Sequence, residues 1–475
     1  MADDAPGSQE LTLADDAATG KVSSAPSRSG QGEASAPEPL TAVQRWRNIA
    51  FLSVGWCVAV SVLFIQVSNT PGVVLRLTGS RGLATLSFGI MICMGAVACL
   101  PGAATMHRYG RRYTYLAGGL VALGGAVLQC FGMDSENEGL LIVGSVLQGP
   151  MYGLANSLRF ASAEFALPHE RPRALAALVA GALFSAVTGP ELARRARDMI
   201  DGSPTTGAYV IACILYVVQI VSVCFLVQWH RVPRKKELPV GAPPEPAKPG
   251  QDPVRAPRPY AAVVTHCLTS VDFVLAMGAA AWAFGWMASL MGATPVLMSS
   301  NGRSRDDSTT VLEVHLISMF LPGFVSGRTV QKFGALNNLL FGFLVLAAGT
   351  GVYFVPDAEW MYFVALVLLG VGWNFAYVAA SVLGTQYVAR QKAAPRDVVM
   401  MQGLFDTGVL AVMSTGTMSV GYAIDGIGKD STLGYFMAIG GVATIVALGL
   451  AVALWVRRPG TEAEAGAEGG AREKA

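Results

Sequence analysis

Long apolar runs dominate this sequence and constrain its fold more than any other feature. Stretches of about 20 apolar residues with few charges, the length that a helix needs to cross a bilayer core, recur about a dozen times. Only 14% of the residues are charged, against roughly 25% in soluble domains, and 52% are apolar. This pattern excludes a soluble enzyme, a nucleic-acid-binding domain and a disordered scaffold. The chain is predicted to be an all-α polytopic membrane protein.

The apolar runs fall into two groups of six, separated by a polar, proline-rich stretch. The predicted organisation is a disordered cytoplasmic N-terminal tail (1–43), a six-helix half (44–229), a cytoplasmic linker (230–262), a second six-helix half (263–458) and a cytoplasmic C-terminal tail (459–475). The twelve predicted transmembrane helices cover roughly 49–68, 84–106, 113–132, 140–165, 173–192, 206–229, 266–292, 309–330, 334–354, 360–387, 398–423 and 432–456.

Basic residues indicate the side of the membrane on which each loop lies, because Lys and Arg near span ends stay in the cytoplasm. With the N-terminus inside, the outer loops are poor in basic residues and two of them are acidic, with an exception at Arg194–Arg197. Both termini are therefore predicted to be cytoplasmic. Because no targeting signal is visible, we expect an integral protein of the plasma membrane, in contact with membrane lipid. The predicted cytoplasmic segments contain Arg108, Arg111, Arg112, Arg171, Lys332, Arg390 and Lys392 among others.

The sequence contains no recognisable catalytic, metal-binding or cofactor-binding motif. All seven cysteines fall within or beside predicted spans, where a thiol behaves as a small apolar group, and the five histidines are scattered. We find no metal-binding spacing, no phosphate-binding glycine loop and no set of nucleophile, base and orienting residue. A net charge of +2 does not favour a polyanionic partner. We therefore expect no enzyme activity, cofactor, metal, nucleic acid or obligate protein partner.

A short turn is repeated in the two groups of spans. Residues 108–112 read Arg-Tyr-Gly-Arg-Arg between the second and third spans, and residues 327–334 read Gly-Arg-Thr-Val-Gln-Lys-Phe-Gly between the eighth and ninth. Gly334 follows Gly110 by 224 residues. Repeated six-helix halves are typical of secondary transporters, which bind substrate near the bilayer midplane between the halves.

Six plus six spans with this turn after spans two and eight resemble the major facilitator superfamily, from about Arg45 to Arg458. In that family the turn reads Gly-x-x-x-Asp-Arg-x-Gly-Arg-Arg and acts as a latch of the cytoplasmic gate. His107 and Gln331 stand where the family has the acid. The resemblance implies a gating role for His107, Arg108, Gly110, Arg111, Arg112, Gly327, Lys332 and Gly334.

Other segments narrow the resemblance. The fourth span resembles the family's Arg-x-x-Gln-Gly element, with Ser145 at the arginine position, so proton coupling through that arginine is not implied. Residues 159–164, 168–171, 315–327 and 370–375 are together similar to a branch found in bacteria and protists that includes riboflavin transporters. The resemblance implies riboflavin or a related flavin as the solute.

The fourth span carries a polar stripe. Tyr152, Asn156 and Arg159 are spaced i, i+4 and i+7, which places them on one helix face that begins near the middle of the membrane. An intramembrane arginine needs a partner or water, so this face is predicted either to line a substrate cavity or to latch the cytoplasmic end. Glu164, one turn further on, is predicted to join a gating cluster of ion pairs.

Aromatic and amide side chains gather on two other spans. Trp373, Asn374 and Tyr377 lie on or beside one face of the tenth span, and Trp282 and Trp286 are an i, i+4 pair on the seventh. Such groups suit a flat heteroaromatic solute, so these five residues are candidates for substrate binding. The alternative is that the rings pack against neighbouring helices.

Two ionisable residues inside spans complete the candidates for coupling or gating. Asp406 lies about two turns into the eleventh span and is predicted to carry a proton or to contact substrate. His315 lies in the outer half of the eighth span. Its imidazole titrates near neutrality, so it is either pH-responsive or a packed side chain bonded to a carbonyl.

The sequence thus predicts a secondary transporter that moves a small organic solute by alternating access, with riboflavin uptake as the specific hypothesis. Two alternatives remain open. One is an exporter of drugs or metabolites with the same fold, and the other is a membrane adaptor or receptor that does not transport.

Overall fold

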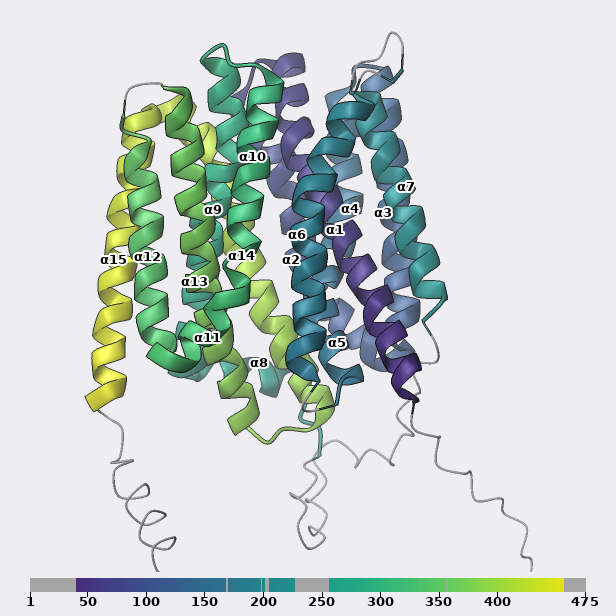
Figure 1. Ribbon diagram of the computed structural model, residues 1–475, viewed down its shortest axis with the longest axis vertical. Helices are drawn as coiled ribbons and strands as arrows, with labels where there is room; N and C mark the ends of the chain where they lie inside the picture. The colour runs from purple at the N-terminus through teal and green to yellow at the C-terminus, as the bar shows by residue number, and fades with distance from the viewer. Residues whose placement is uncertain are drawn as a thin grey trace, which may run out of the picture. The chain divides into compact units, whose positions relative to one another are not determined.

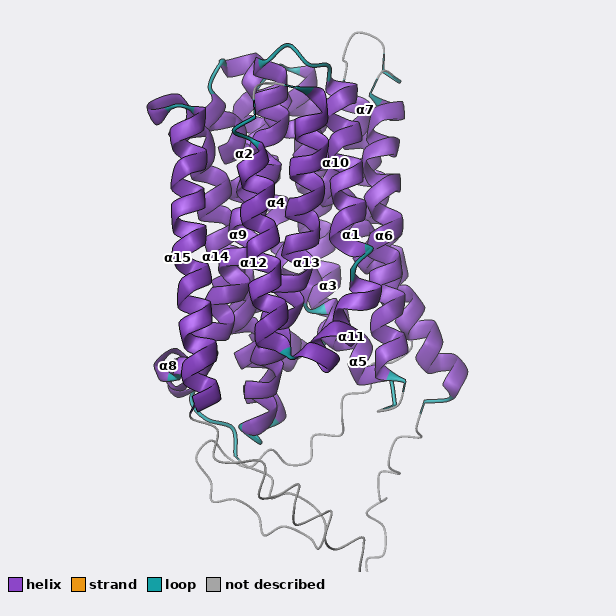
Figure 2. Cartoon of the chain, turned by 60° about the vertical axis from the view of Figure 1, so that its left-hand side comes forward, coloured by secondary structure: helices purple, strands orange, loops and turns teal. Residues whose placement is uncertain are grey.

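The computed structural model describes residues 40–167, 170–197, 199–200, 205–226, 256–355 and 358–456. Throughout these residues the regular elements are helices, and Figure 2 shows them as a bundle joined mainly by short loops. The predicted N-terminal tail up to residue 39, the predicted linker up to residue 255 and the predicted C-terminal tail lie outside the described residues.

The helices follow the two predicted groups along the chain (Figure 1). The first group is α1 (Ala42–Thr78), α2 (Arg81–Tyr109), α3 (Arg111–Asp134), α4 (Glu138–Asn156), α5 (Leu158–Phe165), α6 (Arg171–Ala196) and α7 (Thr206–Cys224). The second group is α8 (Tyr260–Thr269), α9 (Val271–Ser300), α10 (Arg305–Phe320), α11 (Gly323–Phe333), α12 (Ala335–Val352), α13 (Glu359–Arg390), α14 (Pro395–Ile427) and α15 (Lys429–Val456).

Most of the described helices have the length and composition of membrane-spanning segments. In the described part of the chain, ten segments are long and apolar enough to cross a membrane, with α10 and α11 counted as one. The segment formed by α4 and α5 and the helix α6 occupy the positions of the predicted fourth and fifth spans. The predicted all-α polytopic fold with two six-helix halves is confirmed. The short helix α8 precedes the seventh span, and the predicted boundary between the linker and the second half falls within it.

Two spans that the sequence predicts as continuous are interrupted. The fourth is divided between α4 and α5 at Ser157, and the eighth is divided between α10 and α11 at Leu321 and Pro322. Proline has no backbone N–H and its ring clashes with the preceding helical turn, which explains the second interruption. The first interruption has no proline at Ser157 and depends on the contacts described below.

The repeated turn has the same backbone conformation in both halves. Gly110 separates α2 from α3 with φ 89° and ψ 155°, and Gly334 separates α11 from α12 with φ 85° and ψ 155°. Side chains other than glycine rarely adopt this positive φ, so glycine is required at both positions. We call the end of the bundle with these two turns the turn end, and the other end, where α2 begins and α14 ends, the opposite end.

The halves meet most extensively along α2 and α14. Glycines allow this close approach near the opposite end, because a Cβ atom on Gly421 of α14 would lie 2.3 Å from the carbonyl oxygen of Arg81. The side chain of Arg81 donates to Asp425 over 2.9 Å and to Ser300 over 3.2 Å, and Arg197 donates to Asp306 over 3.0 Å. These contacts join the two halves at the opposite end.

The core of the first half contains a neutral polar network. Gln66 of α1 and Gln129 of α3 form a reciprocal amide pair at 2.7 and 3.1 Å, and Gln148 of α4 donates to Gln129 over 2.7 Å. Ser145, at the family's arginine position, accepts from Gln129 over 3.0 Å. Amides and hydroxyls therefore satisfy one another where the family pattern has a charge.

Candidate functional site

Arg159, Asp406 and Tyr377 form a buried cluster between the two halves. Nη2 of Arg159 on α5 donates to a carboxylate oxygen of Asp406 on α14, and Nη1 donates to the Tyr377 hydroxyl on α13 over 2.7 Å. The side chains of Arg159 and Asp406 are 20% and 7% exposed. A charge at this depth is unfavourable without a partner, and each of these residues supplies one for the other. The cluster thus links the first half to two helices of the second.

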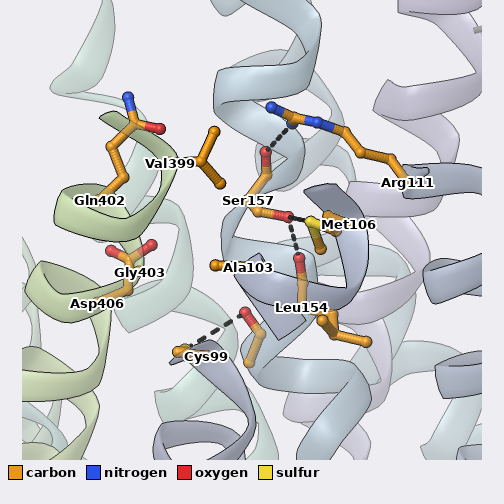
Figure 3. A pocket seen from close by; sticks show the side chains of 11 residues that line it. Cys99, Ala103, Met106, Arg111, Leu154, Ser157, Val399, Gln402, Gly403 and Asp406 are labelled. Atoms are coloured by element: carbon orange, nitrogen blue, oxygen red, sulfur yellow. Dashed lines mark hydrogen bonds between the residues drawn. The ribbon is translucent and has the colours of Figure 1, made fainter. Parts of the chain in front are cut away.

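A pocket lies beside this cluster, on the side of the turn end (Figure 3). It has an empty volume of about 380 Å³, which includes solvent at its mouth. Its wall combines a carboxylate, an amide, a hydroxyl, a thiol, a thioether and a guanidinium among apolar groups. The side chains that supply them are Asp406, Gln402, Ser157, Cys99, Met106 and Arg111.

The aromatic side chains of α13 stack beside the charged cluster. The rings of Trp373 and Tyr377 lie 5.1 Å apart at 11°, and Phe284 of α9 packs against both at 5.0 and 5.2 Å. Phe320 at the end of α10 meets Trp373 edge-on. Trp373 is 6% exposed, and its indole nitrogen has no hydrogen-bond partner among the described residues. An apolar, flat-walled environment, with the unpaired indole N–H of Trp373 in it, therefore adjoins Arg159.

Three other predicted binding residues lie in packed positions. The indole N–H of Trp286 donates to the Thr350 hydroxyl over 2.9 Å, inside the second half between α9 and α12. Asn374 donates to the carbonyl of Met319 over 2.7 Å, where α10 approaches its end. Trp282 is half-buried next to Trp286, with ring centroids 6.3 Å apart. The structure therefore does not bring these three into the charged cluster.

The two remaining residues of the polar stripe on the fourth span also have partners. The Asn156 amide donates back to the carbonyl of Tyr152 over 3.1 Å. The Tyr152 hydroxyl lies 3.9 Å from the sulfur of Met413 on α14, so this side chain crosses the interface between the halves. Tyr152 also lines a second small pocket, together with Met91, Met151 and Tyr216. Of the predicted stripe, Arg159 is the residue that reaches the charged cluster.

His315 is packed between α10 and α13. It is fully buried, and its Nδ1 lies 2.6 Å from the carbonyl oxygen of Leu366. This is the arrangement expected for the packed alternative, in which the imidazole is bonded to a carbonyl.

The gating residues predicted from the repeated turn lie at the turn end. Arg111 is 8% exposed and donates to the carbonyl of Ser157 over 3.4 Å, while Arg108 stacks over the ring of Tyr109 and Lys332 over that of Phe333. The first turn thus contacts the fourth span directly. The side chain of Glu164 lies outside the described part of the structure. His107, Arg108, Gly327, Lys332 and Gly334 are exposed, and Gly110 and Arg112 are half-buried.

Several residues of the site were not predicted from the sequence. Cys99, Met106, Ser157 and Gln402 line the pocket, and Tyr115 contacts Ser157. Small polar residues within an apolar helix carry little signal of their own. The opposite charges of Arg159 and Asp406 inside two predicted spans could have indicated their pairing, however, because intramembrane charges usually pair.

These observations define the class of protein: a polytopic helical membrane protein whose two six-helix halves enclose a charged and aromatic cluster. Comparison of the sequence with protein families gives the particular assignment. The family model described as Major Facilitator Superfamily matches residues 49–394, and the chain belongs to this superfamily of membrane transporters. The family predicted from the repeated turn is confirmed.

Curated relatives are similar over most of the chain. The riboflavin transporter RfnT of Brucella anthropi is 26% identical over 339 residues, which cover 71% of this chain and 80% of RfnT. The uncharacterized MFS-type transporter YddS of Bacillus subtilis is 28% identical over 317 residues, 64% of this chain and 69% of YddS. A second Bacillus subtilis protein, the uncharacterized MFS-type transporter YdeG, is 24% identical over 339 residues, 69% of this chain and 76% of YdeG.

Proposed function

We propose that this transporter imports riboflavin or a closely related flavin across the plasma membrane. The observation that carries the proposal is the similarity to the riboflavin transporter RfnT along 80% of that protein's length. The chemistry of the buried cluster supports the same solute. The proposal concerns substrate and direction, since membership of the transporter superfamily follows from the family match.

Aromatic stacking supports a flat heteroaromatic solute. Trp373 and Tyr377 stack with ring centroids 5.1 Å apart, and an isoalloxazine ring can pack on an aromatic face in the same way. The free indole N–H of Trp373 can donate a hydrogen bond to a carbonyl of that ring. The pairing of Arg159 with Asp406 leaves that part of the interface without an uncompensated charge, which suits a neutral ligand. Gln402 offers an amide for the ribityl hydroxyls.

Alternating access is the mechanism that the two-half architecture supports. The described contacts at the opposite end, including the Arg81–Asp425 and Arg197–Asp306 ion pairs, join the halves there. The pocket beside Asp406 lies toward the turn end. A solute would be released toward the turn end after the halves close at the opposite end, and the reverse rocking would break these ion pairs.

The charge distribution supports an orientation with the turn end in the cytoplasm. The basic residues Arg108, Arg111, Arg112, Lys332 and Arg390 lie in segments at this end, as the positive-inside rule requires of cytoplasmic loops. In this orientation both termini are cytoplasmic, and release toward the turn end is import.

The test is uptake of radiolabelled riboflavin by cells that cannot make the vitamin, with and without this chain. We expect saturable uptake, rescue of growth and competition by unlabelled riboflavin. Trp373→Ala should abolish uptake, whereas Trp360→Ala, at a 54% exposed position near the start of the same helix, should not. Surface expression is measured for each variant. No uptake by a chain that reaches the surface would refute riboflavin import, and a fall in cellular riboflavin would indicate export.

A further inference from the structure

The junction between α4 and α5 is held by backbone and side-chain contacts that converge on Ser157. The N–H of Ser157 bonds to the carbonyl of Leu154 over 3.0 Å, in place of the i−4 carbonyl of Gly153 that a regular helix would use. The freed Gly153 carbonyl accepts from the Cys99 thiol at 3.8 Å. The Ser157 hydroxyl donates to the Leu154 carbonyl over 2.7 Å, which favours the irregular turn over the helix.

Two side chains of α3 brace this junction from outside. The hydroxyls of Tyr115 and Ser157 are hydrogen-bonded at 2.7 Å, and the Ser157 hydroxyl also donates to the Leu154 carbonyl. Nη1 of Arg111 donates to the Ser157 carbonyl over 3.4 Å. Tyr115 is 1% exposed and packs in the core of the first half, so its hydroxyl is presented from a rigid support.

The braced junction sets the direction of Arg159. Arg159 lies two residues after Ser157, in the first turn of α5, and each helical residue rotates by about 100°. A small rotation at Ser157 therefore swings the guanidinium across the interface with the second half. Its two partners there, Asp406 and Tyr377, come from two different helices, so the geometry tolerates little change in its direction.

The geometry points to Tyr115 as a positioning residue: its hydrogen bond to Ser157 holds the α4–α5 junction in the form that directs Arg159 to Asp406. Arg111 and Tyr115 both belong to α3, which begins directly after the turn at Gly110. A movement of this turn would therefore shift the junction at Ser157 and, through it, the ion pair between the halves. The effect on transport rests on the proposed function, whereas the effect on the junction does not.

The experiment compares Tyr115→Phe with Tyr113→Phe, a matched control on the same helix at a position that is 69% exposed. The first readout is the KM and maximal rate of riboflavin uptake. Loss of one buried hydrogen bond is expected to raise KM roughly five-fold, with surface expression unchanged. Tyr113→Phe should leave both parameters as in the wild type.

The second readout does not require transport. Cys99 lines the pocket and bonds to the freed Gly153 carbonyl, so its alkylation by N-ethylmaleimide reports on the junction. Peptide mapping by mass spectrometry separates it from the other cysteines. Tyr115→Phe should accelerate alkylation of Cys99 several-fold, as should Ser157→Ala, while Ser157→Thr keeps the hydroxyl and should restore the slow rate.

A double variant tests whether Tyr115 acts through Arg159. If it does, adding Tyr115→Phe to Arg159→Gln leaves the KM and maximal rate of the residual uptake where Arg159→Gln alone puts them. The inference is overturned if Tyr115→Phe matches Tyr113→Phe in both readouts, or if its effects on uptake add fully to those of Arg159→Gln. Failure of riboflavin uptake in the wild type would refute the proposed function alone, since the Cys99 readout remains.

Discussion

The guanidinium of Arg159 on α5 is hydrogen-bonded to the carboxylate of Asp406 on α14, across the interface between the two halves of the transporter. Each residue neutralises the charge of the other, and either charge would be unfavourable at this buried position without its partner. The pair therefore depends on the relative position of the halves, which is the quantity that alternating access changes. Its replacement should affect stability and transport together.

Arg159→Gln and Asp406→Asn are each expected to reduce uptake strongly and to lower the stability of the purified protein by about 3–5 kcal/mol, because the remaining charge is buried without its partner. Thermal unfolding in detergent and solute uptake measure the two effects. The double reversal Arg159→Asp with Asp406→Arg should recover part of the stability. Arg195→Gln, at an exposed ion pair with Glu191, is the control and should change stability by less than about 1 kcal/mol. Equal effects of the control and the buried variants would contradict this account.

The ion pair between Arg81 and Asp425 is predicted to keep the opposite end closed. Thr85 is fully buried in the seam between α2 and α14, so a cysteine there is reached by a membrane-impermeant thiol reagent only when the seam opens. Adding Asp425→Asn to Thr85→Cys should raise the labelling rate by up to about five-fold, the range expected from a partly exposed pair. High salt should raise the rate for Thr85→Cys alone and have less effect on the double variant. An unchanged labelling rate in the double variant would mean that the ion pair does not help to keep the opposite end closed.

Glycine at 421 is predicted to be required for the seam. Any Cβ atom there would lie 2.3 Å from the Arg81 carbonyl, so Gly421→Ala should separate α2 from α14, reduce uptake and destabilise the protein by about 1–3 kcal/mol. Gly426→Ala on the same helix is the matched control, because a Cβ atom at 426 meets nothing within 4 Å. The control should keep full uptake and the wild-type Tm. A Gly421→Ala variant with wild-type Tm and uptake would show that the seam can widen freely.

Much of the fold was readable from the sequence because span length and apolar composition depend on the membrane rather than on tertiary contacts. The turn glycines were readable for a similar reason, since Gly110 and Gly334 adopt backbone conformations that only glycine favours. Pro322 was a signal for the interruption of the eighth span, although that span was predicted as continuous. The interruption at Ser157 had no such signal, because Cys99, Arg111 and Tyr115 hold it from other helices.

The composition of the site was less predictable. Helical periodicity places Arg159 on a face but does not say which helix covers that face, and Asp406 is 247 residues away. Trp286 and Asn374 satisfy the same pattern of aromatic and amide groups, yet their hydrogen bonds go to Thr350 and Met319 within the second half. A residue type shows what a side chain can bind, whereas the neighbouring helix decides whether it is free to do so.

The glutamine network is predicted to stabilise the first half as a rigid body. Gln66, Gln129 and Gln148 are at most 1% exposed and bond to one another, so Gln129→Leu should leave buried amide groups unsatisfied and destabilise the protein by about 1–3 kcal/mol. Gln386→Leu, at an exposed position of α13, is the control and should leave the Tm unchanged.

Because Gln66 and Gln129 are reciprocal partners, the double replacement by leucine should destabilise the protein by less than the sum of the two single replacements. Thermal unfolding of the purified variants measures this difference. Strict additivity would mean that the two amides act independently. A loss for Gln129→Leu no larger than that for Gln386→Leu would mean that the network does not stabilise the first half, and that its neutral side chains merely fill the place where the family pattern has an arginine.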